Sequence, residues 1–266
     1  MRKIIPFAAF LLLSFAAMAQ DFGQLDSLMA VYVRAIQRES NETKTAEADY
    51  MISAASDSLA RQHIALWLFD HYREAPLMGE EAVALHIYDS WLAGGGIAFR
   101  SEFDEMDAKL FADFNRNSLI GMDAPVISLR RPCGGKTPVP RAGHTALLWF
   151  YDTSCSKCAL EAKVLPGVLD SETGVPVDFF AIYTGQDRKQ WKSFRKSFKL
   201  HNRNIRLRHL WDPEIDSDYL RLYGVISTPK LYMTDSRGTI IGRRLEVENL
   251  PQMLSLAEQI EQLYKK

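Results

Sequence analysis

Two cysteines, Cys155 and Cys158, are separated by two residues and follow closely on an apolar segment that ends at Tyr151. Two thiols at this spacing can close a disulfide, and helix-forming sequence starts at the first of them. If Cys155 opens a helix, its sulfur lies beside unpaired backbone N–H groups and the positive end of the helix dipole, which favour the thiolate by up to ~2 kcal/mol. Lys157 acts in the same direction, whereas Asp152 opposes it if its carboxylate points inward. The spacing therefore predicts a redox site.

The chain has one further cysteine, Cys133, within a turn-like segment at residues 131–136. A chain of this length can bury a core without disulfides, so we interpret the pair as catalytic and Cys133 as a lone loop thiol. A zinc site needs a second ligand pair, and no second Cys-x-x-Cys or His-x-His pair exists. Residues 134–137 resemble the end of a phosphate loop, but Arg130 stands where its first glycine belongs. We therefore expect neither a metal nor a nucleotide cofactor.

The N-terminal sequence predicts export. Arg2 and Lys3 precede an apolar run over residues 4–17 that is too short to span a membrane, and residues 17–19 form a small-x-small cleavage pattern. We expect a signal peptide over residues 1–19 and a periplasmic or secreted location. No cysteine follows the cleavage site and no later segment is long and apolar enough to span a membrane, so we expect no stable membrane anchor. A retained N-terminal anchor is the disfavoured alternative.

Charge divides the chain in two. Residues 20–120 contain 8 Lys/Arg against 17 Asp/Glu, a net charge of −9, and residues 121–266 contain 22 against 16, a net charge of +6. The pattern of apolar residues changes at the same point. Both observations predict a helical domain over residues 20–120 and a second domain over residues 121–266.

The first half has helical periodicity. Apolar positions predict helices over residues 25–36, 50–72, 82–92 and 103–114. Asp57 and Ser58 are able to interrupt the second of these. The triple glycine at residues 94–96 is expected to end a helix rather than bind phosphate, because no strand precedes it. The histidines of this half that follow are not spaced as metal ligands: His63, His71 and His86. We find no catalytic constellation in this half.

The second half alternates strands and helices. Apolar runs at residues 145–151 and 177–183 predict parallel strands buried on both faces, with a helix over residues 156–169 between them. Further elements are expected in the order helix 188–199, strand 207–211, helix 215–223, hairpin 230–233 with 239–242, and helix 250–263. This order predicts an α/β fold, a mixed sheet with helices on both faces, preceded by a smaller all-α domain.

Several motifs of the second half resemble the thioredoxin fold. They are the strand that ends in Cys-x-x-Cys, the βαβ unit, the segment Tyr223-Gly224-Val225-Ile226-Ser227-Thr228-Pro229 before a hairpin, and the closing helix. Residues 121–129 resemble the entry segment of TlpA/ResA-type secreted thiol-disulfide oxidoreductases, and so does the acidic residue three places after the second cysteine, Glu161. The resemblance spans residues 121–266, and the helical half resembles N-terminal extensions fused to such domains.

The resemblance implies roles for five residues. Cys155 is the attacking thiol, and Cys158 resolves the mixed disulfide. Pro229 aligns with the cis-proline of the family, so Thr228 would present backbone groups to a substrate strand beside Cys155. Glu161 takes the position of a family acid that can relay a proton, and an exposed helix carboxylate is the alternative that stays open.

The chain also departs from the family pattern. Ser154 replaces the tryptophan that precedes the first cysteine, and the helix proline is displaced to Pro166. Trp149 occupies the position of the buried aspartate of thioredoxin, and an indole cannot transfer a proton to a thiol. These changes leave the dithiol chemistry intact and leave the redox potential undetermined by sequence.

The resemblance implies a thiol-disulfide oxidoreductase acting on protein thiols or disulfides, and we favour net reduction. Because no nucleotide motif is present, we expect electrons from another protein, a membrane electron-transfer protein. The alternatives are a disulfide-forming oxidase or isomerase and a non-enzymatic binding module that acts through the helical domain. A peroxidase is disfavoured because no Pro-x-x-x-Thr-x-x-Cys motif surrounds Cys155. The basic run at residues 188–208 indicates a solvated helix face rather than a nucleic-acid partner.

Overall fold

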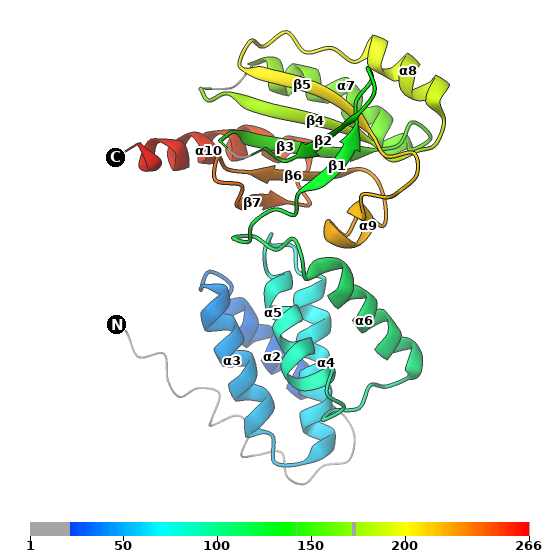
Figure 1. Cartoon of the computed structure of the whole chain (residues 1–266). Helices are drawn as coiled ribbons and strands as arrows, with labels where there is room; N and C mark the ends of the chain where they lie inside the picture. Colours follow the sequence, from blue (N-terminus) through cyan, green and yellow to red (C-terminus); the bar gives the residue numbers. More distant parts are fainter. Residues whose placement is uncertain (1–21, 142, 172–173, 266) are drawn as a thin grey trace. The chain divides into compact units, whose positions relative to one another are not determined.

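The first half of the chain is helical, as its apolar periodicity predicts (Figure 1). The structure, a computed structural model, describes residues 22–141, 143–171 and 174–265. The helices of this half are α2 (Gly23–Ala35), α3 (Asn41–Ala54), α4 (Ser58–Arg73), α5 (Glu81–Ile87), the π-helix η1 (Tyr88–Leu92) and α6 (Glu102–Asn115).

Two side chains determine where α3 and α4 begin. The Ser40 hydroxyl oxygen accepts a hydrogen bond from the Thr43 N–H at 3.2 Å, and the Asp57 carboxylate accepts one from the Ala60 N–H at 2.9 Å. These caps satisfy backbone donors that a helix start leaves unpaired. The helical pattern over residues 50–72 is therefore divided between two helices, at the interruption that Asp57 marks.

The helices enclose a core of their own. Ile52, Ile64 and Val83 are fully buried. A buried ion pair joins α3 to the residue before α5, with Lys44 Nζ 2.7 Å from Glu80 Oε1. Because each charge is the partner of the other, neither is left uncompensated in this core.

The second half is built on a seven-stranded mixed sheet in the order β2-β1-β5-β4-β3-β6-β7. Strands β3, β4 and β5 are parallel neighbours, whereas the other neighbouring strands are antiparallel. Every residue of β3 and β4 is buried, as their continuous apolar sequences predict. The strands are β1 (Ile127–Arg130), β2 (Lys136–Val139), β3 (Thr145–Tyr151), β4 (Val177–Tyr183), β5 (Ile205–Trp211), β6 (Lys230–Thr234) and β7 (Ile240–Arg243).

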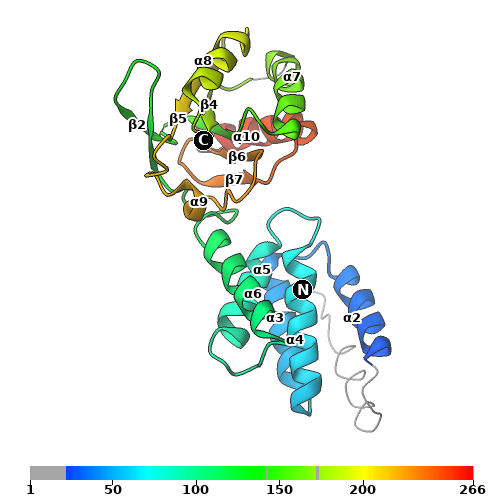
Figure 2. The same cartoon turned by 90° about the vertical axis from the view of Figure 1, so that its right-hand side faces the viewer.

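Helices cover both faces of this sheet (Figure 2). On one face, Leu165, Trp191 and Leu254 of three different helices pack in a single core cluster. On the other face, Tyr219 stacks on Phe150 of β3, with ring centroids 5.7 Å apart. The expected fold class, a mixed sheet with helices on both faces after a smaller helical region, is confirmed. The helices are α7 (Ser156–Ser171), α8 (Arg188–Ser197), α9 (Tyr219–Leu222), the 3-10 helix η2 (Val247–Asn249) and α10 (Leu250–Tyr264).

The sequence interpretation did not include strands β1 and β2, which form a hairpin. The turn between them agrees with the turn expected at residues 131–136, and Gly134 and Gly135 adopt positive φ angles of 92° and 68° in it. Cys133 lies in this turn, exposed and outside any disulfide. It is a loop thiol, as expected.

The helix expected over residues 215–223 is too long. Only Tyr219–Leu222 is helical. Ile215 and Asp218 have φ angles of 53° and 57°, in the left-handed region that a right-handed helix cannot include. The Asp212 carboxylate accepts hydrogen bonds from two backbone N–H groups of this stretch and stabilises the turn instead.

The chain divides into two compact units directly after Ala112, inside α6. The change in sequence pattern indicates a boundary after residue 120. The last residues of α6 belong to the second unit, and within that unit Asn115 Oδ1 accepts hydrogen bonds from Arg243 and Arg244, both at 2.8 Å.

The expected signal peptide at residues 1–19 lies outside the described residues. Within the described ranges, none of the helices combines the length and apolarity that crossing a membrane requires.

Candidate active site

Strand β3 and a tight loop position the first cysteine. The Tyr151 carbonyl accepts hydrogen bonds from the Thr184 N–H at 2.9 Å and the Thr184 hydroxyl at 3.1 Å, which join the ends of β3 and β4. The Asp152 carboxylate accepts hydrogen bonds from the Ser154 backbone N–H and hydroxyl, both at 2.7 Å. Ser154, at the position where the resemblance leads one to expect tryptophan, therefore donates both of these hydrogen bonds to Asp152 and directly precedes Cys155.

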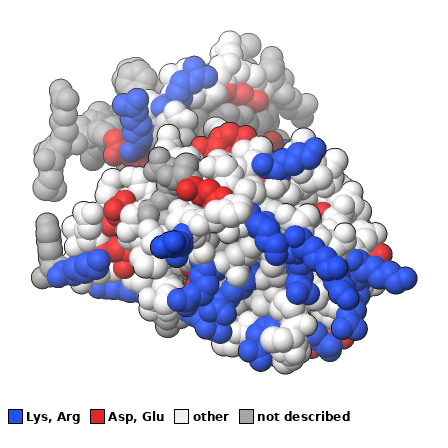
Figure 3. Space-filling model, turned by 90° about the horizontal axis from the view of Figure 1, so that it is seen from above, with Lys and Arg blue, Asp and Glu red and all other residues white. Residues whose placement is uncertain are grey.

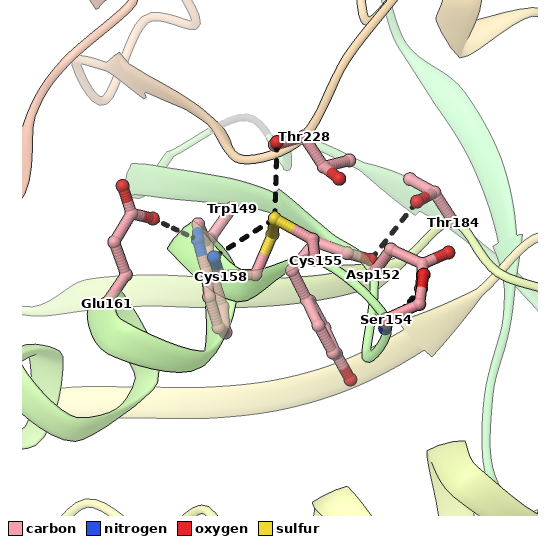
Figure 4. Close-up of a disulfide and its surroundings, with 9 residues drawn as sticks. Trp149, Asp152, Ser154, Cys155, Cys158, Glu161, Thr184 and Thr228 are labelled. Atoms are coloured by element: carbon pink, nitrogen blue, oxygen red, sulfur yellow. Dashed lines mark hydrogen bonds between the residues drawn. A yellow bond between two sulfur atoms is a disulfide. The ribbon is translucent and has the colours of Figure 1, made fainter.

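Cys155 and Cys158 form a disulfide at the N-terminus of α7 (Figure 4). Their Cα atoms are 5.2 Å apart, and the Cys158 backbone N–H donates to Cys155 Sγ at 3.0 Å. Cys158 is 2% exposed, whereas Cys155 is only partly buried. In the reduced protein this N–H and the helix dipole stabilise a thiolate at Cys155. The more exposed of the two cysteines is thus the one whose thiolate the helix start stabilises.

The loop before β6 faces the disulfide. The peptide bond between Thr228 and Pro229 is cis, as the resemblance implies. The Thr228 carbonyl oxygen lies 3.3 Å from Cys155 Sγ (Figure 4). Backbone groups of an extended loop can pair with an extended peptide segment. The fold therefore brings the two residues expected to bind substrate next to the expected attacking sulfur.

Glu161 is a buried carboxylate one helical turn beyond Cys158. It is 7% exposed, and its Oε2 accepts a hydrogen bond from Trp149 Nε1–H at 2.8 Å. Burial raises the pKa of Glu161 above its usual value, although the Trp149 hydrogen bond and the charge of Lys157 act against this. The open alternative, an exposed helix carboxylate, is wrong. A buried acid near a dithiol is suited to accept and return a proton.

Three of the expected site residues share one hollow. Glu161, Thr228 and Pro229 line a cavity of about 170 Å³, which we call the Glu161 hollow. Lys230 and Arg244 also line it. Sequence reasoning missed both, although Lys230 follows directly on Pro229 and its position beside the motif was a usable signal. Arg244 is separated from the motif by a whole hairpin, so no local pattern could have identified it.

The cations around the Glu161 hollow differ in their environments. Lys157 Nζ is 2.8 Å from a carboxylate oxygen of Glu246, and this contact raises the pKa of Lys157. Burial lowers the pKa of Lys230, and the nearby charge of Arg244 lowers it further. The Lys157 ammonium is therefore paired with the Glu246 carboxylate, which weakens its electrostatic effect on the dithiol.

Basic side chains gather on one face of the second unit (Figure 3). Arg195 of α8 lies over the Trp191 ring, 4.7 Å from its centroid. The basic residues of α8 and the following loop are otherwise solvated, as expected for a helix face. The exposed ones are Arg188, Lys189, Lys192, Lys196, Lys199 and Arg203.

One acidic group among the described residues has the spacing of cation ligands. Oxygen atoms of Asp212, Glu214 and Asp216 all lie within 4.8 Å of one another. Glu214 is paired with Arg130 at 2.8 Å, and Asp216 is paired with Lys136. The third carboxylate, Asp212, accepts hydrogen bonds from the Asp216 and Ser217 N–H groups and from the Ser217 hydroxyl. Because all three carboxylates already have partners, we assign no metal to them.

No model of a known protein family matches the chain, and no curated protein is significantly similar to it. Among solved structures, a thioredoxin-like protein from Bacteroides caccae ATCC 43185 is 14% identical with a TM-score of 0.68, over 94% of this chain and 92% of that chain. The thioredoxin domain of a thiol-disulfide oxidoreductase from Bacteroides vulgatus is 19% identical with a TM-score of 0.45, over 52% of this chain and 96% of that one. A thiol:disulfide interchange protein from Bacteroides sp. is 20% identical with a TM-score of 0.44, over 53% of this chain and 90% of that one. By the first of these likenesses, together with the strand order and the cis-proline loop, the chain has a thioredoxin-like fold.

Proposed function

We propose that this protein is a thiol-disulfide oxidoreductase that exchanges the Cys155–Cys158 disulfide with partner proteins. The observation that carries the proposal is the environment of Cys155, a partly exposed residue whose sulfur receives the Cys158 N–H at 3.0 Å and faces the Thr228 carbonyl at 3.3 Å. A structural disulfide requires neither access nor a stabilised thiolate, whereas a nucleophilic thiol requires both.

In the reducing direction, the Cys155 thiolate attacks one sulfur of a partner disulfide. The partner S–S bond breaks, a Cys155–partner disulfide forms, and the second partner sulfur leaves as a thiolate. The Cys158 thiolate then attacks Cys155 Sγ, which closes the Cys155–Cys158 disulfide and releases the first partner sulfur. Two electrons pass from the dithiol to the partner, and the same steps in reverse oxidise a partner dithiol.

Glu161 serves the second step in this mechanism. Cys158 is buried, and burial in apolar surroundings favours the neutral thiol. A base must therefore take the proton from Cys158 before it can attack. Glu161 is the buried carboxylate one turn away on the same helix, and we assign it this role.

The cellular setting is also a proposal. The leader sequence at residues 1–19 favours the periplasm or secretion, where disulfides form and persist. We favour net reduction of partner disulfides, with electrons from a membrane electron-transfer protein, because the sequence motifs resemble exported reductases. A glutathione redox titration of the Cys155–Cys158 pair tests this direction: a potential well above that of the glutathione pool would favour the oxidase or isomerase instead.

The test is covalent capture of partners. Cys158→Ser removes the resolving thiol, so Cys155 should hold partner proteins as mixed disulfides when the variant is expressed in its own compartment. We expect discrete adducts on non-reducing gels that disappear when thiol is added. The matched controls are Cys133→Ser, which should leave the adducts unchanged, and the Cys155→Ser, Cys158→Ser double variant, which should abolish them.

The same experiment separates an enzyme from a binding module. If no adducts form with Cys158→Ser while the double variant still binds its partners at undiminished affinity, the dithiol is incidental. Such a result would support the non-enzymatic module that acts through the helical unit.

A further inference from the structure

The indole of Trp149 is fixed in the interior behind the disulfide. Trp149 is fully buried on β3 and stacks on Tyr151, with ring centroids 4.5 Å apart. Its only polar atom, Nε1, donates to Glu161 Oε2 at 2.8 Å (Figure 4). The remaining aromatic neighbours are Phe179, Phe194 and Phe198. A side chain packed on so many rings cannot turn away, so the direction of its N–H is set by the core.

The Trp149 hydrogen bond favours one state of Glu161. An N–H donor stabilises the ionised carboxylate, whereas the protonated acid gains less from it. Burial acts the other way and raises the pKa of Glu161. We propose that Trp149 is a positioning residue for the resolving step: its indole N–H holds the Glu161 carboxylate in place and ionised, ready to take the proton of Cys158. This inference rests on the proposed thiol-disulfide exchange.

Other charged groups face Glu161 and contribute to its ionisation. Lys157, one turn earlier on α7, lowers the pKa of Glu161, whereas Glu246 and Glu248 raise it. Lys230 and Arg244 line the same hollow. Trp149 differs from all of these because it donates a hydrogen bond directly to the carboxylate and is fully buried. Its effect should therefore persist at high salt, where the effects of the exposed charges are screened.

The resolving step, in which Cys158 attacks the mixed disulfide at Cys155, can be measured separately with 5,5′-dithiobis(2-nitrobenzoate) in a Cys133→Ser background. The reduced protein releases one thionitrobenzoate when Cys155 attacks the reagent, and a second when Cys158 attacks the Cys155 mixed disulfide. Stopped-flow absorbance gives the rate of the second release as a function of pH. Trp149→Phe should move the midpoint of this pH profile upward by about one unit, since a hydrogen bond to a charged group is lost. The first release should keep its pH profile.

Three further variants make the test decisive. Glu161→Gln should remove this titration, and adding Trp149→Phe to Glu161→Gln should cause no further shift. Trp191→Phe, at another buried tryptophan of the same unit, should leave the midpoint unchanged. If Trp149→Phe does not fold, benzothienylalanine inserted at position 149 replaces the N–H by sulfur and keeps the shape of the ring.

The possible outcomes distinguish the inference from the function on which it rests. An unchanged midpoint in Trp149→Phe or in the benzothienylalanine variant, while Glu161→Gln does change the profile, overturns the role of Trp149 alone. The role of Trp149 is also overturned if Trp149→Phe shifts the midpoint equally in the presence and absence of the Glu161 carboxylate. If Glu161→Gln leaves the pH profile unchanged, proton transfer from Cys158 to Glu161 is overturned as a whole. If no second thionitrobenzoate is released, the exchange function itself is overturned.

Discussion

Cys155 and Cys158 are three positions apart in the chain but occupy different environments. Cys158 lies in the core cluster with 2% of its surface exposed, whereas Cys155 is partly exposed and receives a backbone N–H from the helix start. The helix therefore stabilises charge on the accessible sulfur, and burial disfavours charge on the other. This difference in environment gives the two thiols separate roles in one reaction.

Alkylation should reveal the difference directly. In the reduced protein carrying Cys133→Ser, limiting iodoacetamide at neutral pH should modify Cys155 on the order of tenfold faster than Cys158, because the thiolate is the reactive species. Peptide mass spectrometry of the labelled protein measures the ratio. Equal labelling of the two cysteines in the folded protein would contradict the assignment of the attacking thiol.

At the scale of elements, helix α7 and the segment before β6 must hold their positions for the site to exist. Helix α7 carries Cys158 and Glu161 on one side of the disulfide, and the other segment supplies Thr228. Gly224 begins this second segment with φ at 57°, and a Cβ there would overlap the backbone carbonyl of Phe114. The close approach of these two backbones is thus possible only with glycine at this position.

Two glycine substitutions should have opposite effects on stability. Gly224→Ala should lower the free energy of unfolding by roughly 2 kcal/mol or more, because it adds the left-handed penalty to a backbone clash. Gly167→Ala, inside α7 with no atom beyond the adjacent residues and the helix's own backbone within 4 Å of the new Cβ, should raise it by about 0.5–1 kcal/mol. Urea unfolding curves with comparable slopes measure both changes. A destabilising Gly167→Ala or a neutral Gly224→Ala would show that this reading of the backbone is wrong.

At the scale of the whole molecule, the stability of the second unit depends on a half-buried histidine. His209 on β5 lies edge-on to Phe194 and Phe198. Burial, together with the nearby charges of Arg195 and Lys199, lowers the pKa of His209 to about 4. The folded unit therefore keeps this imidazole neutral well into the acidic range.

This half-buried histidine makes stability depend on pH. Below its ordinary pKa of roughly 6.5, the unfolded chain binds a proton at His209 that the folded chain does not bind until about pH 4. The free energy of unfolding should therefore fall as the pH drops from about 6.5 to 4. In His209→Gln the fall between pH 7 and pH 5 should be smaller by roughly 2 kcal/mol, as measured by urea unfolding at each pH. Parallel pH curves for the two proteins would rule out this linkage.

Local sequence determined much of the second unit. The runs at residues 145–151 and 177–183 predict β3 and β4 with their observed limits, because a strand buried on both faces must be apolar throughout. Cys155 and Cys158 can pair because their spacing on one helical turn is a local property. The cis-proline loop came from a resemblance to a family, not from any physical pattern in the residues. The hairpin of β1 and β2 was missed because its strands have only four residues each.

Tertiary structure decided what surrounds the sulfurs. Thr228 is 73 positions from Cys155, and only the folding of β6 against β3 brings its carbonyl to the sulfur. The resemblance singled out Trp149 and Glu161 separately, but no sequence pattern joins them, and only the fold brings them together in a hydrogen bond. Apolar periodicity reports which residues are buried and in which element. It carries no information on which buried groups meet, because that depends on how elements distant in the chain pack together.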